Sequence, residues 1–146
     1  MQLEHLCDGE YRYDPPPTVI TPYGGHEAVA FGGGHGQLTG ERLGGATRWS
    51  NFPRRREDGT FLPRVTGVID TDDGATVLYE TTGVSLPPPE GSTRRLVTST
   101  VRFYADADAY RWLNAVVAVE EGVIDAATGV LHTRIWVCQP DHRLSA

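Results

Sequence analysis

The sequence predicts an all-β protein, a small antiparallel β-barrel or β-sandwich formed by one domain over residues 1–146. First, 17 glycines and 10 prolines among 146 residues disfavour a bundle of long helices. Second, short runs of β-branched and aromatic residues alternate with polar ones, as in half-buried strands. Third, Gly, Pro and Asp-Gly turn residues separate these runs, and no long helical pattern lies between them, which disfavours a parallel α/β sheet.

The predicted elements follow from these signals in chain order. Residues 1–23 supply a first strand and a proline-rich lead-in, and residues 50–63 form a loop with Asp58-Gly59 as its turn. Asp106–Asn114 changes period and predicts one short helix that covers a barrel end. The tail, residues 139–146, is expected to be loose. The predicted strands are 1–13, 18–21, 26–31, 37–43, 64–70, 75–83, 94–104, 115–121 and 130–138.

A glycine-rich stretch from Gly24 to Trp49 holds nine of the 17 glycines. Because glycine clusters favour turns, bulges or close backbone approach, we interpret Gly32–Gly34 as a corner between two strands. Gly122 is likewise expected to end the strand before it. A phosphate-binding loop is the alternative, but the stretch lacks the GxxxxGK[ST] pattern and does not lead into a clear helix.

Charge and hydropathy exclude several classes of protein. The net charge is −6, and the one basic run, Arg54–Arg56, is followed directly by two acids, so no nucleic-acid surface is expected. No apolar run is long enough to span a membrane, and the N-terminus has no apolar core of a secretory signal. The expected compartment is the cytoplasm.

The residue types present also limit the chemistry. All 13 basic residues are arginine, so neither a lysine Schiff base nor a P-loop lysine is available. Cys7 and Cys138 show no CxxC spacing and are interpreted as free thiols. The histidines are scattered, and only a site assembled in space from His35, His132 and a carboxylate is conceivable. We therefore expect no metal and no cofactor.

Several strands pair one apolar face with one mixed, aromatic-plus-arginine face. On the last strand, Leu131, Thr133, Ile135 and Val137 oppose His132, Arg134 and Trp136. In one interpretation the mixed face is the solvated exterior. In the other it lines a cavity, because so many large aromatic and arginine side chains are costly to expose together.

Four motifs in order carry a family resemblance: GGG-x-G-x-L-x-G with GGATRW, DGT-x-L-x-R, TDDGA, and Y-x-WLN. Over residues 24–137 the chain resembles the bacterial and fungal domain-of-unknown-function family DUF3237. The resemblance implies a small antiparallel barrel of the calycin-like or allene-oxide-cyclase-like kind. It also implies kinship with a fungal cofactor-free cyclase that adds a hydroxyl across an alkene within one molecule. The family often has an acid just before the tryptophan of the glycine-rich motif, where this chain has Thr47-Arg48.

Eight residues are candidates for a site. Arginine forks can hold an anion or enolate, tyrosine and histidine can move a proton, and aromatic rings can stack on a ligand. Each also has a structural interpretation, such as an ion pair of Arg64 with Asp70 or Asp73. The candidate catalytic residues are Arg64, Tyr79, His132 and Arg134, and the candidate substrate-binding residues are Trp49, Tyr104, Trp112 and Trp136.

Three functions remain open from the sequence. The first is a cofactor-independent lyase, isomerase or cyclase acting on a small aromatic or polyketide-like molecule in the barrel. The second is a small-molecule-binding barrel without chemistry, and the third is a structural or interaction module with a filled barrel. The expected partners are a small molecule and, if the outer faces are apolar, a second copy of the chain in a homodimer.

Overall fold

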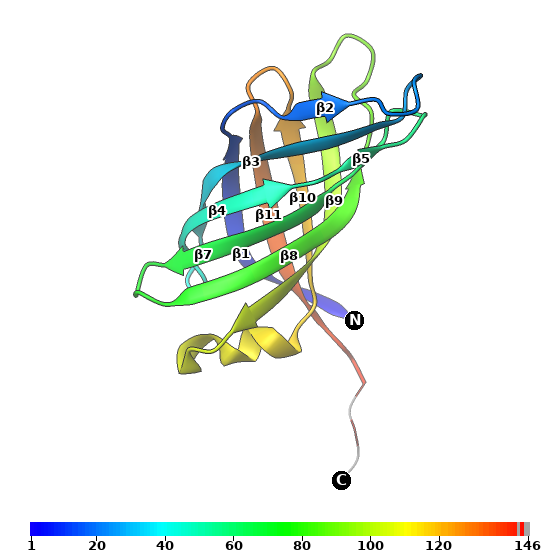
Figure 1. Ribbon diagram of the computed structural model, residues 1–146. Coiled ribbons are helices and arrows are strands. Elements are labelled where there is room, and N and C mark those ends of the chain that lie inside the picture. Colours follow the sequence, from blue (N-terminus) through cyan, green and yellow to red (C-terminus); the bar gives the residue numbers. More distant parts are fainter. Residues whose placement is uncertain (143, 145–146) are drawn as a thin grey trace.

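The computed structural model describes residues 1–142 and 144, and these residues form a closed antiparallel barrel of eight long strands (Figure 1). Around the ring the order is β1, β11, β10, β9, β8, β7, β4 and β3, and β3 pairs back onto β1. This closure confirms the predicted barrel. The strands are β1 (Gln2–Tyr13), β3 (Ala28–Thr39), β4 (Gly45–Asn51), β7 (Arg64–Thr71), β8 (Thr76–Ser85), β9 (Arg94–Ala105), β10 (Ala118–Asp125) and β11 (Val130–Gln139).

Short elements mark the two ends of the barrel differently. At one end lie β2 (Thr18–Ile20), β5 (Arg54–Arg55) and β6 (Phe61–Leu62), which extend the pairing of β3 and β8. At the other end lies η1 (Asp108–Ala115), a 3₁₀ helix in the segment for which the sequence predicts a helix (Figure 1). Residues 50–63, which were predicted to be a loop, contain the two short strands β5 and β6. The predicted turn at Asp58-Gly59 is present between them, with Gly59 at φ 86°.

The glycines of β3 correct one prediction. Residues Gly32–Gly34 lie inside one continuous strand and form no corner. A Cβ on Gly34 would lie 1.7 Å from the Arg12 carbonyl oxygen of β1, and one on Gly33 would lie 2.6 Å from the Trp49 carbonyl oxygen of β4. Gly122, predicted as a break, lies inside β10 for the same reason, because its Cβ would lie 2.4 Å from the His132 carbonyl oxygen. These glycines permit close approach of neighbouring backbones.

The half of the barrel nearest η1 is filled by side chains. Phe103, Ile69, Val77 and Val101 project inward from neighbouring strands and are almost completely buried, and Leu113 of η1 closes the end with no exposed surface. Burying an aliphatic or aromatic side chain of this size contributes roughly 1.5–3 kcal/mol. This half therefore supplies most of the hydrophobic stabilisation, and the site lies in the other half.

The start of β1 and the end of β11 lie beside each other at the η1 end. Gln2 faces Gln139 in the β1–β11 ladder, and the Met1 amine contacts the Asp141 carboxylate. The predicted loose tail thus begins within β11, and residues 143, 145 and 146 lie outside the described residues. In the described part of the chain, no helix combines the length and apolar character needed to cross a membrane.

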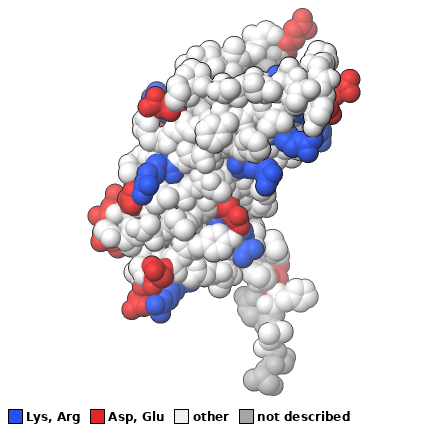
Figure 2. Space-filling view, in the orientation of Figure 1, with Lys and Arg blue, Asp and Glu red and all other residues white. Residues whose placement is uncertain are grey.

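Charged side chains are spread over the surface. On the face in Figure 2, acidic and basic groups are interspersed in small clusters between broad uncharged areas. The net charge of −6 is therefore not concentrated in one patch of this face.

Candidate functional site

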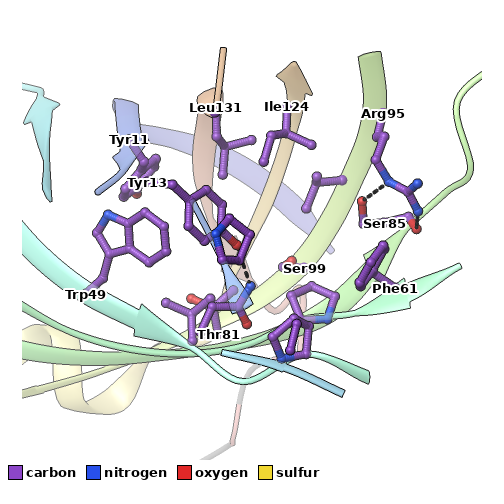
Figure 3. A pocket seen from close by; sticks show the side chains of 18 of the residues that line it. Tyr11, Tyr13, Trp49, Phe61, Thr81, Ser85, Arg95, Ser99, Ile124 and Leu131 are labelled. Carbon is purple, nitrogen blue, oxygen red and sulfur yellow. Dashed lines mark hydrogen bonds between the residues drawn. The ribbon is translucent and has the colours of Figure 1, made fainter. Parts of the chain in front are cut away.

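A cavity of about 240 Å³ occupies the half of the barrel opposite η1 (Figure 3). Its wall is mostly apolar and comes from β1, β4, β7, β8, β9, β10 and β11, with Phe61 of β6 near the mouth. An eight-stranded barrel is just wide enough to be filled by side chains or to hold one small ligand. This chain does both, one in each half.

Aromatic side chains form one side of the cavity. The rings of Trp49 and Tyr13 meet edge to face with centroids 4.7 Å apart, and the Trp49 and Tyr11 rings meet similarly at 6.3 Å. The Asn51 amide donates to the Tyr13 hydroxyl at 3.0 Å, and its carbonyl oxygen accepts the Arg64 backbone N–H at 2.9 Å. These contacts hold the aromatic wall in one arrangement.

Glycines on the inner surface make room for two tyrosine rings. Gly67 lies directly opposite Tyr79 in the β7–β8 ladder, and a Cβ there would lie 2.3 Å from the tyrosine ring. A Cβ on Gly9 would lie 2.6 Å from the ring of Tyr11. Both rings therefore lie flat over backbone and bring their hydroxyl groups into the barrel.

Glu120 is the acidic residue of the cavity wall. It projects inward from β10, between Ser99 of β9 and Ile135 of β11, and is only 7% exposed. Burial raises the pKa of Glu120 from 4.5 to about 7, and the nearby hydroxyls of Thr133 and Tyr11 oppose part of this shift. The carboxyl group therefore exchanges a proton near neutral pH.

Two tyrosine hydroxyls share this interior. Burial, followed by the repulsion of Glu120, raises the pKa of Tyr11 well above its ordinary value. Burial also raises the pKa of Tyr79, although a 2.8 Å hydrogen bond between its hydroxyl and Thr47 Oγ1 acts in the opposite direction. Both phenols therefore stay protonated and serve as hydrogen-bond donors.

Two further hydroxyls near Glu120 have spare bonding capacity. Ser99 Oγ and Thr133 Oγ1 are buried and make no hydrogen bond of ordinary geometry to the described residues. Buried polar atoms without partners are uncommon and costly. Ser99 lines the cavity, whereas Thr133 lies behind its lining, so Ser99 is the cavity residue whose hydroxyl has no partner among the described residues.

Arg95 lies at the mouth of the cavity (Figure 3). Its Nε donates to Ser85 Oγ at 3.2 Å, and its Nη2 donates to the Ser85 and Gly59 carbonyl oxygens at 3.0 and 2.7 Å. Its guanidinium carbon lies 4.8 Å from the centroid of the Phe61 ring. The two N–H groups of Nη1 make no hydrogen bond to the described residues, which leaves them available.

Trp49 and Tyr79, among the residues predicted from sequence, line the cavity. Trp112 does not. It lies on η1 at the closed end, where the Arg42 guanidinium carbon is 3.9 Å from its ring centroid. The ring is partly buried against the core.

Arg64 and Tyr104 lie on the outer surface, not in the cavity. Arg64 is exposed, because its neighbour Val65 takes the inward position on β7. It pairs with neither expected partner, since Asp70 faces Arg48 at 3.7 Å. Tyr104 is 46% exposed, and its hydroxyl donates to the Glu80 carboxylate beside it on the outer face.

The mixed face of β11 is also outside. His132 Nδ1 lies 3.9 Å from the Glu10 carboxylate, and Arg134 Nε lies 3.9 Å from the Asp8 carboxylate, both on the exterior. Trp136 follows the same alternation, while the opposite face packs into the barrel. Of the two interpretations of this mixed face, the solvated exterior is therefore correct for β11, and the cavity lining is wrong. The polar pairs across β1 explain why it is tolerated outside.

Glu120, Tyr11 and Arg95 are the site residues that the sequence interpretation missed. Their signal is the alternation itself. Arg95 is in phase with Val97, Val101 and Phe103, which are buried inside the barrel. Glu120 is in phase with the fully buried Ala118. A charged residue at an inward position of an apolar strand is the pattern that identifies both.

Several residues of the recognised motifs build the closed end of the barrel. The Tyr110 hydroxyl donates to the Asp73 carboxylate at 2.8 Å, and the Asn114 amide exchanges two 2.7 Å hydrogen bonds with the backbone of Ala105. They attach η1 to the β7–β8 turn and to the end of β9. These motif residues therefore have structural contacts far from the cavity.

The cysteines and histidines form no gathered site in the described chain. Cys7 is buried, and burial raises the pKa of its thiol, which keeps the group protonated. No three His, Cys, Asp or Glu side chains of the described residues are grouped as metal ligands.

Comparisons with known proteins identify a family and related structures. A family model described as a protein of unknown function (DUF3237) matches residues 1–138. A β-barrel-like protein from Acinetobacter baumannii superimposes with a TM-score of 0.83 at 18% identity, over 94% of this chain and 96% of that one. A conserved protein of unknown function from Rhodopseudomonas palustris gives 0.81 at 17% identity, with coverages of 93% and 96%.

A fungal structure is also similar. It is described as an enzyme from Penicillium herquei and superimposes with a TM-score of 0.68 at 22% identity, over 92% of this chain and 93% of that one. No curated protein matches the sequence. At these identities the structural likeness establishes the barrel fold.

Proposed function

The chain belongs to the DUF3237 family, and we propose that it is a cofactor-independent lyase, isomerase or cyclase that moves a proton on a small ring-containing molecule. The observation that carries this proposal is Glu120, a carboxyl group with a pKa of about 7 in the wall of an apolar cavity. A general acid or base works best when its pKa lies near the working pH. The fungal relative described as an enzyme supports a catalytic role.

The residues around Glu120 supply the other requirements of such chemistry. When Glu120 takes a proton from a substrate carbon, negative charge develops on the substrate. The protonated hydroxyls of Tyr11 and Tyr79 are donors for that charge inside a water-poor barrel, where such hydrogen bonds are strong. Trp49 and Tyr13 give the ring a flat wall. Arg64, His132 and Arg134 have no part in this proposal because they lie outside.

A base-sensitive probe tests the proposal without the natural substrate. In 5-nitrobenzisoxazole, removal of the ring C–H proton by a carboxylate forms the nitrile and breaks the N–O bond, which releases a coloured nitrophenolate. We expect the wild-type rate to rise as the pH passes through about 7, since the ionised form of Glu120 is the base. The Glu120→Gln variant should lose this rate and its pH dependence.

Glu121→Gln is the matched control. Glu121 is the next residue of β10 and points outward, so this variant should keep the wild-type profile. A wild-type rate no faster than that of Glu120→Gln would overturn the assignment of Glu120 as a base.

A binding barrel without chemistry is the second candidate, and the apolar lining of the cavity favours it. It requires occupancy of the cavity but no role for the Glu120 proton. A protein that binds ring compounds and leaves the probe unchanged would fit this second function. The interaction module was predicted to have a filled barrel, which differs from the half-hollow barrel found.

A further inference from the structure

We infer that the ligand of this cavity is an organic anion, a carboxylate on a body of one or two rings, whose charged group binds Arg95 at the mouth. The inference deepens the proposed function and rests on its assignment of the cavity as the ligand site. It concerns recognition, whereas Glu120 concerns chemistry, and the two assignments can fail separately.

The first argument is the unbalanced charge at the mouth. Arg95 and Arg55 both lie against Phe61, with guanidinium carbons 4.8 and 5.9 Å from the ring centroid. In the described chain neither arginine has a carboxylate within ion-pair distance, although the next residue, Arg56, pairs with Asp58 at 2.7 Å. Partial burial, followed by the repulsion of the nearby Arg55, lowers the pKa of Arg95. A bound anion would relieve this repulsion.

The second argument is the orientation of the Arg95 guanidinium. Three of its five N–H groups are used by oxygens of Ser85 and Gly59, which fixes the plane of the group. The remaining pair belongs to Nη1. A prepositioned guanidinium binds an anion at a smaller entropic cost than a freely rotating lysine. Arg95 is thus held as a receptor group and not only as a surface charge.

The third argument is the separation of the two polar ends. Arg95 precedes Ser99 by four residues on β9, and Ser99 is the direct neighbour of Glu120. At the usual rise along a strand, their Cα atoms are about 13 Å apart. Between them Val97 of the same strand lines the wall, and Ile124 and Leu131 line it beside Arg95, since Ile124 pairs with Arg95 and Leu131 with Ile124. A ligand with an anionic group at one end and an apolar body would place the anion at Arg95 and the body against the apolar wall.

The cavity volume limits the size of that body. A cavity of about 150 Å³ in another protein holds benzene, and this cavity is about 240 Å³. One ring with substituents or two fused rings therefore fits. A carboxylate at the mouth also keeps its charge away from Glu120, which would otherwise repel it.

Calorimetric binding of 2-naphthoate and its neutral isostere 2-naphthamide tests the inference. At pH 6, where Glu120 is mostly protonated, the wild-type chain should bind the anion more tightly than the amide. The Arg95→Gln variant should weaken naphthoate binding by about ten- to a hundredfold, the usual worth of a hydrogen bond to a charged group, and leave the amide unchanged. Arg95→Lys should retain part of the preference.

Arg94→Gln is the matched control because Arg94 is adjacent on β9 and exposed. The ratio of the affinity for 2-naphthoate to that for 2-naphthamide controls for misfolding, because misfolding would weaken the binding of both ligands equally. Equal wild-type affinities, or an Arg95→Gln variant that loses both ligands alike, would overturn the inference. Anion preference in a protein inactive on the benzisoxazole would contradict the proposed catalysis alone, and activity without anion preference would contradict this inference alone.

Discussion

Glu120 sets a pH dependence of stability at the scale of one residue. Its pKa is about 7 in the folded chain and 4.5 for an ordinary glutamate, so the folded state binds the proton more tightly. Stability is therefore highest below pH 4.5 as far as this group is concerned. It falls as the pH rises to about 7 and is constant above that, with a total loss of roughly 3 kcal/mol.

Replacing the carboxyl group removes that loss. Glu120→Gln should exceed the wild-type unfolding free energy by at most about 1 kcal/mol at pH 5 and by roughly 3 kcal/mol at pH 8. Urea unfolding at the two pH values measures both numbers. Glu121→Gln, on the outer face, should show no such pH-dependent gain. A constant difference between Glu120→Gln and wild type across this range would contradict the assigned pKa.

The same residue shows why the site was harder to predict than the strands. Strand positions follow from alternation, and β9 and β11 were predicted within one residue at each end. Which face points inward depends on the neighbours. Large aromatic and arginine side chains are stable on the outer face when a polar neighbour binds them there, as Glu80 binds the hydroxyl of Tyr104. A sequence does not reveal such partners across strands.

At the scale of an element, η1 acts as the plug of the closed end. The side chain of Leu113, a residue of η1, is completely buried in the core. The Tyr110–Asp73 hydrogen bond holds the helix to the β7–β8 turn. The sequence predicted a short helix here from the change of period over Asp106–Asn114. It did not reveal that the helix completes the core, because that depends on the barrel being closed.

Truncating the plug should affect stability without affecting binding. Leu113→Ala should cost about 2–5 kcal/mol of unfolding free energy, the usual range for a buried leucine. Urea unfolding measures this cost, and Arg111→Ala on the exposed side of η1 should stay within about 0.5 kcal/mol of wild type. The affinity for 2-naphthoate should not change, because the cavity lies in the opposite half. A loss of affinity in folded Leu113→Ala would show that the two ends are coupled.

The glycines of β3 show a second limit of sequence-based prediction. They were interpreted as corners, but the backbones of β1 and β4 approach Gly34 and Gly33 too closely for any side chain. Corner and close approach give the same local sequence signal. Only the pairing of strands far apart in the sequence distinguishes them.

At the scale of the molecule, the barrel divides into a packed half and a hollow half. Phe103 is 2% exposed within the packed half, whereas Leu131 borders the cavity. Phe103→Ala should therefore cost about 3–5 kcal/mol, because it opens a new void. Leu131→Ala should cost only about 1 kcal/mol, because it enlarges a space that already exists. Urea unfolding of both variants checks the contrast, and equal costs would contradict this division.

The start of β1 and the end of β11 meet at the plugged end, and this has a practical consequence. Gln2 and Gln139 face each other in the β1–β11 ladder, on the far side of the molecule from the mouth. A short linker from the end of β11 to the start of β1 can therefore make the barrel circular, and new ends can be opened in the exposed loop at residues 87–92. The same placement suits immobilisation: a protein tethered to a solid support through its N-terminus would present the cavity mouth to the solution.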